Sequence, residues 1–228
     1  MSLEVRRRLG VADAVTLLNA VIGFAAAVVA YTDPGLAARL ILLAAIADAL
    51  DGIIARFVGN TAVGPLLDSI TDVVSFGATP ALFVFGIARD QYGPVAAATP
   101  ATLAVLVLVP AAFVVFSVLR TAFYTVYVDE GQQRPGIQNT LAATILATAY
   151  LAGIAPVPVL LAGSLVLSVL MIAPVSYPKL RARDAVVLGL VQAAAIVNPT
   201  AIQRAFPRLL LVAAIAYLTL APWYYWSE

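Results

Sequence analysis

Four aspartates stand close together in an otherwise apolar stretch, DALDGIIARFVGNTAVGPLLDSITD, which covers residues 48–72. Asp48 and Asp51 are three residues apart, a spacing that places both on one face of a helix. Asp68 and Asp72 are four residues apart and share one face of the next helix. The link between the two helices is short, so they are antiparallel neighbours. The sequence therefore predicts that four carboxylates converge between them.

Carboxylates gathered in an apolar setting need compensating positive charge, because they repel one another and lose hydration. Ordinary interhelical pairs with Arg56, the one basic residue in the stretch, would leave three carboxylates uncompensated. We expect a divalent-metal site instead, and two cations held by shared carboxylates would suit phosphoryl transfer. The chain has no His and no Cys. Its metal ligands must therefore be oxygens, which favour hard cations such as Mg²⁺, Mn²⁺ or Ca²⁺.

Small residues beside the two carboxylate pairs would let a bulky ligand approach the helix backbones. Gly52 and Gly64 have no side chain to obstruct it, and Ala55 leaves room for a base or a sugar. The planar guanidinium of Arg56 is suited to a bidentate contact with phosphate.

Apolar helices must position these residues. The 228-residue chain is 63% hydrophobic and 11% charged, against about 25% charged residues in a soluble domain. Turn-forming stretches divide it into eight candidate spans: 11–31, 36–58, 66–88, 96–126, 137–154, 157–176, 183–198 and 207–226. We therefore expect an all-α polytopic membrane bundle, with one transmembrane domain over residues 1–228 and a short cytoplasmic segment at 1–10.

The distribution of positive charge predicts the orientation. With eight spans, nine Lys and Arg residues fall on the side of both termini and four on the other, so both termini are expected in the cytoplasm. The aspartates then lie at the cytoplasmic end of the bundle. A net charge of +1 and the lack of a long basic run exclude a nucleic-acid partner. Acidic residues in membrane segments also mark ion pathways, so a transporter or an inactive membrane partner is the non-enzymatic alternative.

The pattern D-x2-D-G-x2-A-R-x7-G-x3-D-x3-D resembles the signature of the CDP-alcohol phosphotransferase family of membrane enzymes. The resemblance implies a conserved six-helix core, often with extra helices, and a homodimer, since many members are dimers. The commonest form of the signature has eight residues between the arginine and the second glycine, and this chain has seven. The carboxylate pairs keep their register despite this difference, whereas the conformation of the link is open.

The resemblance also implies roles for individual residues. The positions that match the family's ligands for two divalent ions, Mg²⁺ or Mn²⁺, are Asp48, Asp51, Asp68 and Asp72. Asp72 also matches the general base that activates the acceptor hydroxyl. The positions that match the surroundings of the CDP moiety are Gly52, Ala55, Arg56, Gly64, Thr16 and Asn19. Thr16 and Asn19 lie in TLLNAVIGF, and their alternative role is a polar contact between helices.

Three further stretches are similar to the phosphatidylserine and archaetidylserine synthase branch of this family: SFGATP (75–80), VLRTAFY (118–124) and SYPKL (176–180). Acceptor-binding residues are therefore expected at Arg120, Ser75 and Lys179, with Gly77 shaping the pocket. Two departures from the branch are Phe123, where a second arginine is usual, and GIQNT (136–140), where G-L-P-x-P is usual. The alternative for Arg120 is a topological anchor that extends to the membrane interface.

The resemblance implies phospholipid synthesis at the plasma membrane. The phosphatidyl or archaetidyl group of a CDP-lipid, CDP-diacylglycerol or CDP-archaeol, would pass to the hydroxyl of L-serine, and CMP would leave. Glycerol phosphate and inositol phosphate are the alternative acceptors.

Overall fold

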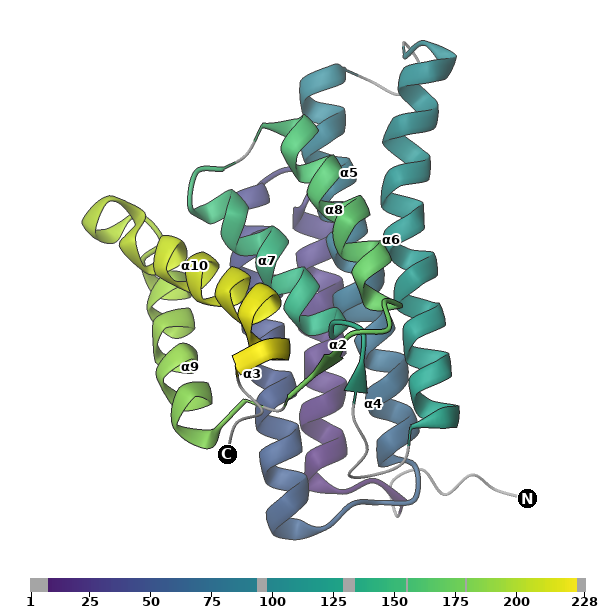
Figure 1. Cartoon of the computed structure of the whole chain (residues 1–228), viewed down its shortest axis with the longest axis vertical. Coiled ribbons are helices and arrows are strands. Elements are labelled where there is room, and N and C mark those ends of the chain that lie inside the picture. The colour runs from purple at the N-terminus through teal and green to yellow at the C-terminus, as the bar shows by residue number, and fades with distance from the viewer. Residues whose placement is uncertain (1–7, 94–97, 129–133, 155, 179, 225–228) are drawn as a thin grey trace.

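Apolar segments form helices along almost the whole of the computed structural model, which describes residues 8–93, 98–128, 134–154, 156–178 and 180–224. The first three helical segments are α2 (Val11–Val29), α3 (Pro34–Val58) and α4 (Gly64–Val73), which continues through the π-helical turn η1 (Val74–Ala78) into α5 (Thr79–Tyr92). The remaining helices are α6 (Pro100–Tyr127), α7 (Asn139–Leu151), α8 (Val157–Met171), α9 (Ala182–Val197) and α10 (Ala201–Tyr224). Figure 1 shows α2 to α8 as an upright bundle, with α9 and α10 against one side.

The all-α membrane fold predicted from the sequence is confirmed. With α4, η1 and α5 counted as one segment, the described residues from Val11 onward form eight helical segments where eight spans were expected. Four segments in the described part of the chain are long and apolar enough to cross a membrane: α2, α4 to α5, α6 and α10. α7 and α8 are apolar but have only 13 and 15 residues, against about 20 for a full crossing. The number of crossings, and the single domain that includes residues 1–7 outside the described ranges, stay predictions.

Local signals explain where the helices begin and end. The carboxylate of Asp33 accepts a hydrogen bond from the Leu36 amide, 2.9 Å away, and Pro34 opens α3. Gly59 ends α3 with a φ of +89°, a conformation that favours glycine. α6 runs through Pro110 as one helix.

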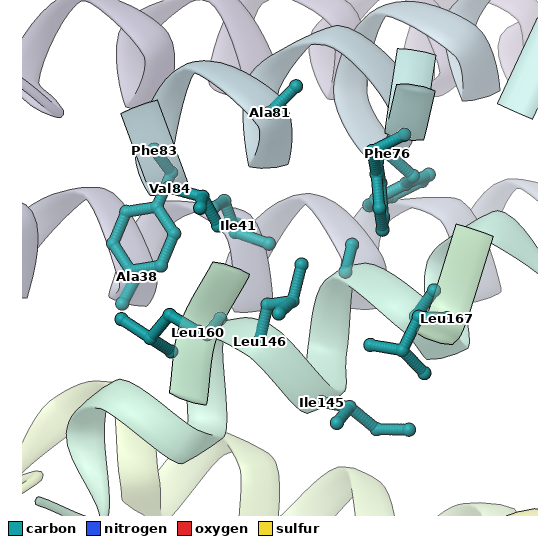
Figure 2. Close-up of a cluster of buried hydrophobic side chains, with 14 of the residues drawn as sticks. Ala38, Ile41, Phe76, Ala81, Phe83, Val84, Ile145, Leu146, Leu160 and Leu167 are labelled. Carbon is teal, nitrogen blue, oxygen red and sulfur yellow. The ribbon is translucent and has the colours of Figure 1, made fainter. Parts of the chain in front are cut away.

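The apolar core lies where η1 and α5 meet three other helices (Figure 2). Phe76 and Phe83 are fully buried. They pack with Ile41 of α3, Leu146 of α7 and Leu160 of α8. This packing holds η1 and α5, which follow directly after the aspartates of α4, against α3, α7 and α8.

Small and hydroxylated residues bring α2 against η1. A Cβ on Gly23 would lie 2.9 Å from the Ser75 Cα, so only glycine allows this approach. The hydroxyl of Thr79 donates to the Gly23 carbonyl at 3.0 Å, and the hydroxyl of Ser75 donates to the Asn19 carbonyl at 3.2 Å. Close packing through small residues and interhelical hydrogen bonds stabilises helix pairs where water does not drive association. It fixes α2 beside the helix that carries two of the aspartates.

The helices beyond the bundle are attached through polar contacts. Gln192 of α9 donates to the Leu42 carbonyl at 2.7 Å, and Arg39 donates to the Ile196 carbonyl at 2.6 Å. A two-residue antiparallel pair, β1 (Arg134–Pro135) with β2 (Ser176–Tyr177), joins the segment before α7 to the segment after α8.

The α2–α5 contact should be sensitive to one added methyl group. A Cβ on Gly86 would lie 2.8 Å from the Ala30 carbonyl oxygen, whereas a Cβ on Gly163 of α8 would meet nothing within 4 Å. Gly86→Ala should therefore destabilise the protein by about 1–3 kcal/mol through overpacking. Gly163→Ala should be neutral or stabilising by up to about 1 kcal/mol, because alanine favours helix. Thermal unfolding of both variants in detergent measures the difference, and equal melting temperatures would contradict this account of the contact.

Candidate active site

Three of the four aspartates in the 48–72 stretch converge. Carboxylate oxygens of Asp48, Asp68 and Asp72 all lie within 4.8 Å of one another. Asp48 comes from the C-terminal half of α3, and the other two come from α4. Asp48 and Asp72 are half-buried and Asp68 is exposed, so the cluster is open on one side. The predicted meeting of the two signature halves is therefore found for these three side chains.

The cluster fits a cation. At an effective dielectric near 20, two unit negative charges 4.8 Å apart repel by about 3.5 kcal/mol. The Asp72 Oδ1 atom is buried and has no hydrogen-bond partner among the described residues. The positive charge of Arg120 acts on Asp72, but one guanidinium does not balance three carboxylates. A set of clustered oxygens with one buried and unpartnered atom is what a hard cation such as Mg²⁺ prefers. These three aspartates could hold a metal ion.

Asp51 is held differently from the other three aspartates. It is buried, and its Oδ2 atom accepts a hydrogen bond from the Thr16 hydroxyl at 2.7 Å. Its charge still acts on Asp68 across the site. Thr16 of α2 thus orients a carboxylate of α3, which gives it a structural task in addition to the nucleotide contact predicted from the sequence.

The first turn of α7 also reaches the cluster. The hydroxyl of Thr140 approaches the Oδ2 atom of Asp48 at 3.4 Å. Next to it, Asn139 is fully buried and donates to the Thr121 hydroxyl at 2.8 Å. Both residues belong to GIQNT, the stretch that departs from the resembled branch. The departure therefore lies against the site rather than away from it.

The small residues of the signature divide into two kinds. A Cβ on Gly52 would meet nothing within 4 Å, so space adjoins α3 there. Arg56 is exposed and its Nε atom donates to the Gly52 carbonyl at 3.0 Å, and Ala55 on the same helix is half-buried. Gly64 differs, because a Cβ there would lie 3.1 Å from the Asp13 Oδ1 atom. Packing within the protein accounts for Gly64, whereas Gly52, Ala55 and Arg56 lie on a part of α3 that a ligand could approach.

Asn19, Ser75 and Gly77 lie in helix contacts. Asn19 is fully buried, and its side-chain nitrogen and oxygen have no hydrogen-bond partner among the described residues. Ser75 is fully buried against the Asn19 backbone. A Cβ on Gly77 would lie 3.0 Å from the Ser117 Cβ of α6. These contacts explain Ser75 and Gly77 without a ligand, but they do not explain the buried Asn19 side chain. The expected roles of all three in nucleotide or acceptor binding stay predictions.

Arg120 is buried at the site. Its side chain is 8% exposed, and its guanidinium carbon lies 5.1 Å from the centre of the Tyr124 ring. It therefore does not extend to the surface as an interfacial anchor would. The positive charge of Arg120 acts on Asp72. The guanidinium therefore lies on the side of the cluster that holds the Asp72 carboxylate. Lys179, the third expected acceptor-binding residue, lies outside the described residues.

Two residues at this end of the bundle, the buried Asp13 and the half-buried Thr61, were missed by the sequence analysis. Asp13 is 2% exposed and accepts hydrogen bonds from the Gly10 amide at 2.7 Å and the Thr61 hydroxyl at 2.8 Å. The signal for Asp13 was its spacing, because it precedes Thr16 and Asn19 by three and six residues on one face of α2. No sequence pattern marks Thr61, since it lies in the link whose length departs from the commonest form of the signature.

Comparisons with known proteins agree with this geometry. The sequence model described as CDP-alcohol phosphatidyltransferase matches residues 9–177, which include α2 to α8 and exclude α9 and α10. An archaetidylserine synthase of Methanothermobacter thermautotrophicus is 29% identical over 172 residues, which are 73% of this chain and 69% of that protein. A CDP-diacylglycerol–serine O-phosphatidyltransferase of Methanocaldococcus jannaschii is 39% identical over 83 residues, 36% of this chain and 38% of that protein.

A mycobacterial relative matches over a similar share of this chain. The CDP-diacylglycerol–serine O-phosphatidyltransferase of Mycobacterium leprae is 36% identical over 101 residues, which are 44% of this chain and 30% of that protein. The matched part is thus more than two thirds of the first relative and less than two fifths of the other two.

The aspartate cluster should bind a divalent cation. Mn²⁺ titrated into the purified protein should give a saturable decrease of the free-ion resonance signal. Asp48→Asn and Asp68→Asn should each weaken binding at least about tenfold, a loss known even for groups beyond the direct ligands. Asp90→Asn removes an exposed carboxylate near the end of α5 and should leave the titration unchanged. Equal Mn²⁺ affinity in all four proteins would contradict the metal site.

Proposed function

This chain belongs to the CDP-alcohol phosphatidyltransferase family, and we propose that it transfers the phosphatidyl or archaetidyl group of a CDP-lipid to the hydroxyl of L-serine, releasing CMP. It is a membrane transferase of phospholipid synthesis. One observation carries the proposal: the two halves of the signature bring Asp48, Asp68 and Asp72 together at one end of the bundle.

Two divalent ions, Mg²⁺ or Mn²⁺, are the proposed cofactors. Asp48, Asp68 and Asp72 would supply the clustered oxygens, and Asp51 would join them from the same face of α3. When bound, such ions neutralise a pyrophosphate and the charge that develops on the departing CMP.

The reaction exchanges one phosphorus–oxygen bond for another. The serine hydroxyl oxygen bonds to the phosphorus nearest the lipid, and the bond from that phosphorus to the bridging oxygen of CMP breaks. The hydroxyl proton must leave as the new bond forms, and a positioned carboxylate accelerates this transfer. We assign the proton to Asp72, whose buried Oδ1 atom has no hydrogen-bond partner among the described residues and thus retains a lone pair for it.

The nucleotide would lie along the open side of α3. Space adjoins Gly52, and Arg56 is exposed one turn further along the helix, where its guanidinium can turn from the Gly52 carbonyl to a phosphate. The small side chain of Ala55 leaves room for the nucleotide between Gly52 and Arg56. Thr16 would act indirectly, through its hydrogen bond to Asp51. Gly64 would act through the shape of the link, because it packs against Asp13. Asn19 is a further candidate on α2 from the sequence.

Serine is the proposed acceptor for two reasons. The matched relatives are named for products or reactions of serine. A zwitterionic amino acid also needs a fixed cation for its carboxylate, and Arg120 is buried beside Asp72. Ser75 and Lys179 are further candidates from the sequence. The proposed donor is CDP-archaeol or CDP-diacylglycerol, because the relatives carry names of both kinds.

The proposed location is the plasma membrane, with the site and both termini on the cytoplasmic side. The excess of Lys and Arg on that side supports this orientation, and the site needs both a membrane-anchored donor and a water-soluble acceptor. A homodimer is proposed from the family resemblance.

The assignment predicts which acceptor drives CMP release. Purified protein in micelles containing a CDP-lipid and Mg²⁺ or Mn²⁺ should release CMP with serine faster than with glycerol phosphate or inositol phosphate. A chelator in excess should stop the release, and added metal should restore it. Faster release with glycerol phosphate would reassign the acceptor, and no release with any acceptor would favour a transporter or an inactive partner.

Arg120→Lys tests the acceptor contact. Lysine keeps the charge but lacks the planar fork that binds a carboxylate with two hydrogen bonds. The KM for serine should rise about ten- to a hundredfold, the loss expected from about 1.5–3 kcal/mol for such a contact. The KM for the CDP-lipid should stay nearly unchanged. A serine KM equal to that of the unmodified protein would remove Arg120 from the acceptor site.

A further inference from the structure

A hydrogen-bonded chain ties the link between α3 and α4 to the start of α2. The Gly64 amide donates to the Thr61 hydroxyl oxygen at 3.0 Å, and that hydroxyl donates to the Asp13 Oδ2 atom at 2.8 Å. The Gly10 amide donates to the same Asp13 atom at 2.7 Å. Two donors from segments that are distant in sequence, the Gly10 amide and the Thr61 hydroxyl, thus meet at one buried carboxylate, and the Gly64 amide joins the chain through Thr61.

Close packing reinforces these hydrogen bonds. A Cβ on Gly64 would lie 3.1 Å from the Asp13 Oδ1 atom, and a Cβ on Gly10 would lie 3.0 Å from the Thr61 methyl group. Both distances are tighter than ordinary contacts, so the two glycines and the Asp13–Thr61 pair fit together with little tolerance. Gly64 is the first residue of α4, and Asp68 and Asp72 follow it within three turns.

We propose that Asp13 and Thr61 form a latch that sets the position of α4 relative to α3, and thereby brings Asp68 and Asp72 to Asp48. Asp13 acts here as a positioning residue, because its Oδ2 atom already accepts two hydrogen bonds and it lies outside the group of converging carboxylates. The latch holds a conformation of the link, residues 59–63, that repulsion between the carboxylates would otherwise open.

The position of the latch makes it suited to this task. Residues 59–63 carry no helix, and most of them are exposed, so their conformation depends on the few contacts that they make with the bundle. Thr16, one helical turn after Asp13, bonds to Asp51. One face of α2 therefore holds the C-terminal part of α3 and the start of α4, which are the two sides of the site.

Two pairs of variants separate the hydrogen bonds from side-chain bulk and charge. Thr61→Val keeps the shape but loses the hydroxyl, and Thr61→Ser keeps the hydroxyl. Asp13→Ala loses both acceptors, and Asp13→Asn keeps an oxygen that accepts but removes the charge. Gln192→Leu is the control, because it deletes an interhelical hydrogen bond, to the Leu42 carbonyl, far from the link.

Mn²⁺ binding is the first measurement, and it rests on the proposed function. Thr61→Val and Asp13→Ala should weaken Mn²⁺ binding roughly tenfold, about 1.4 kcal/mol. Thr61→Ser, Asp13→Asn and Gln192→Leu should stay within about threefold of the unmodified protein, since each keeps the latch. Thermal unfolding in parallel should show that Gln192→Leu loses as much stability as Thr61→Val without the loss of affinity.

Distances between spin labels are the second measurement and need no metal. The chain has no cysteine, so labels can be placed at Phe57→Cys in α3 and Leu66→Cys in α4, both at exposed positions. Thr61→Val should broaden and lengthen the distance distribution in metal-free protein, and Thr61→Ser should restore it.

Each outcome tests the latch independently of the proposed reaction. Unchanged label distances in Thr61→Val and Asp13→Ala would overturn it. Loss of Mn²⁺ binding in Asp13→Asn as severe as in Asp13→Ala, with normal binding in Thr61→Val, would also overturn it, because the charge alone would then matter. If the unmodified protein binds no Mn²⁺ but the label distances change as expected, the latch stands and the metal site fails.

Discussion

Mutual repulsion among carboxylates is the constraint on which the rest of the structure depends. With all three carboxylates ionised and no cation bound, the three pairs of charges within 4.8 Å of one another would repel by roughly 10 kcal/mol at an effective dielectric near 20. That is comparable with the entire stability of a typical domain, about 5–15 kcal/mol. The surrounding helices must therefore oppose a force that drives α3 and α4 apart. Packing of Phe76 and Phe83, on the helical segment that follows Asp72, and the contacts of α2 with α3 and with the link before α4 supply that opposition.

Much of the helical architecture could be predicted because turn residues and apolar length are local signals. The first expected span, 11–31, corresponds to α2 at Val11–Val29, and the span at 157–176 corresponds to α8 at Val157–Met171. The approach of Asp48 to Asp68 and Asp72 was likewise available from helical spacing and a short link. Such reasoning succeeds where neighbours in space are also close in sequence.

Other features depend on partners that are remote in the chain, and residue type alone could not assign them. Gly52 and Gly64 look equivalent in the sequence, yet one adjoins open space and the other packs on Asp13. Ser75 resembles a pocket residue but bonds to the backbone of α2. Thr61 and Thr140 sit in stretches where this chain departs from the resembled pattern, so nothing in the pattern could identify them. Only the positions of neighbouring helices distinguish ligand space from packing.

The π-helical turn η1 sets the direction in which one continuous helical segment presents Asp72 before it and the apolar side chains of α5 after it. An α-helix rotates by about 100° for each residue, and a π turn accommodates one residue more than an α turn. The apolar face of α5 is thus rotated by about that angle from the direction it would take if α4 continued without interruption. Straightening residues 74–78 into a regular α-helix at unchanged length would turn Phe83 and Val84 out of the core while Asp72 stayed in place. Removing one of these residues would instead cancel the offset and keep both directions, so the added residue and the π turn compensate each other.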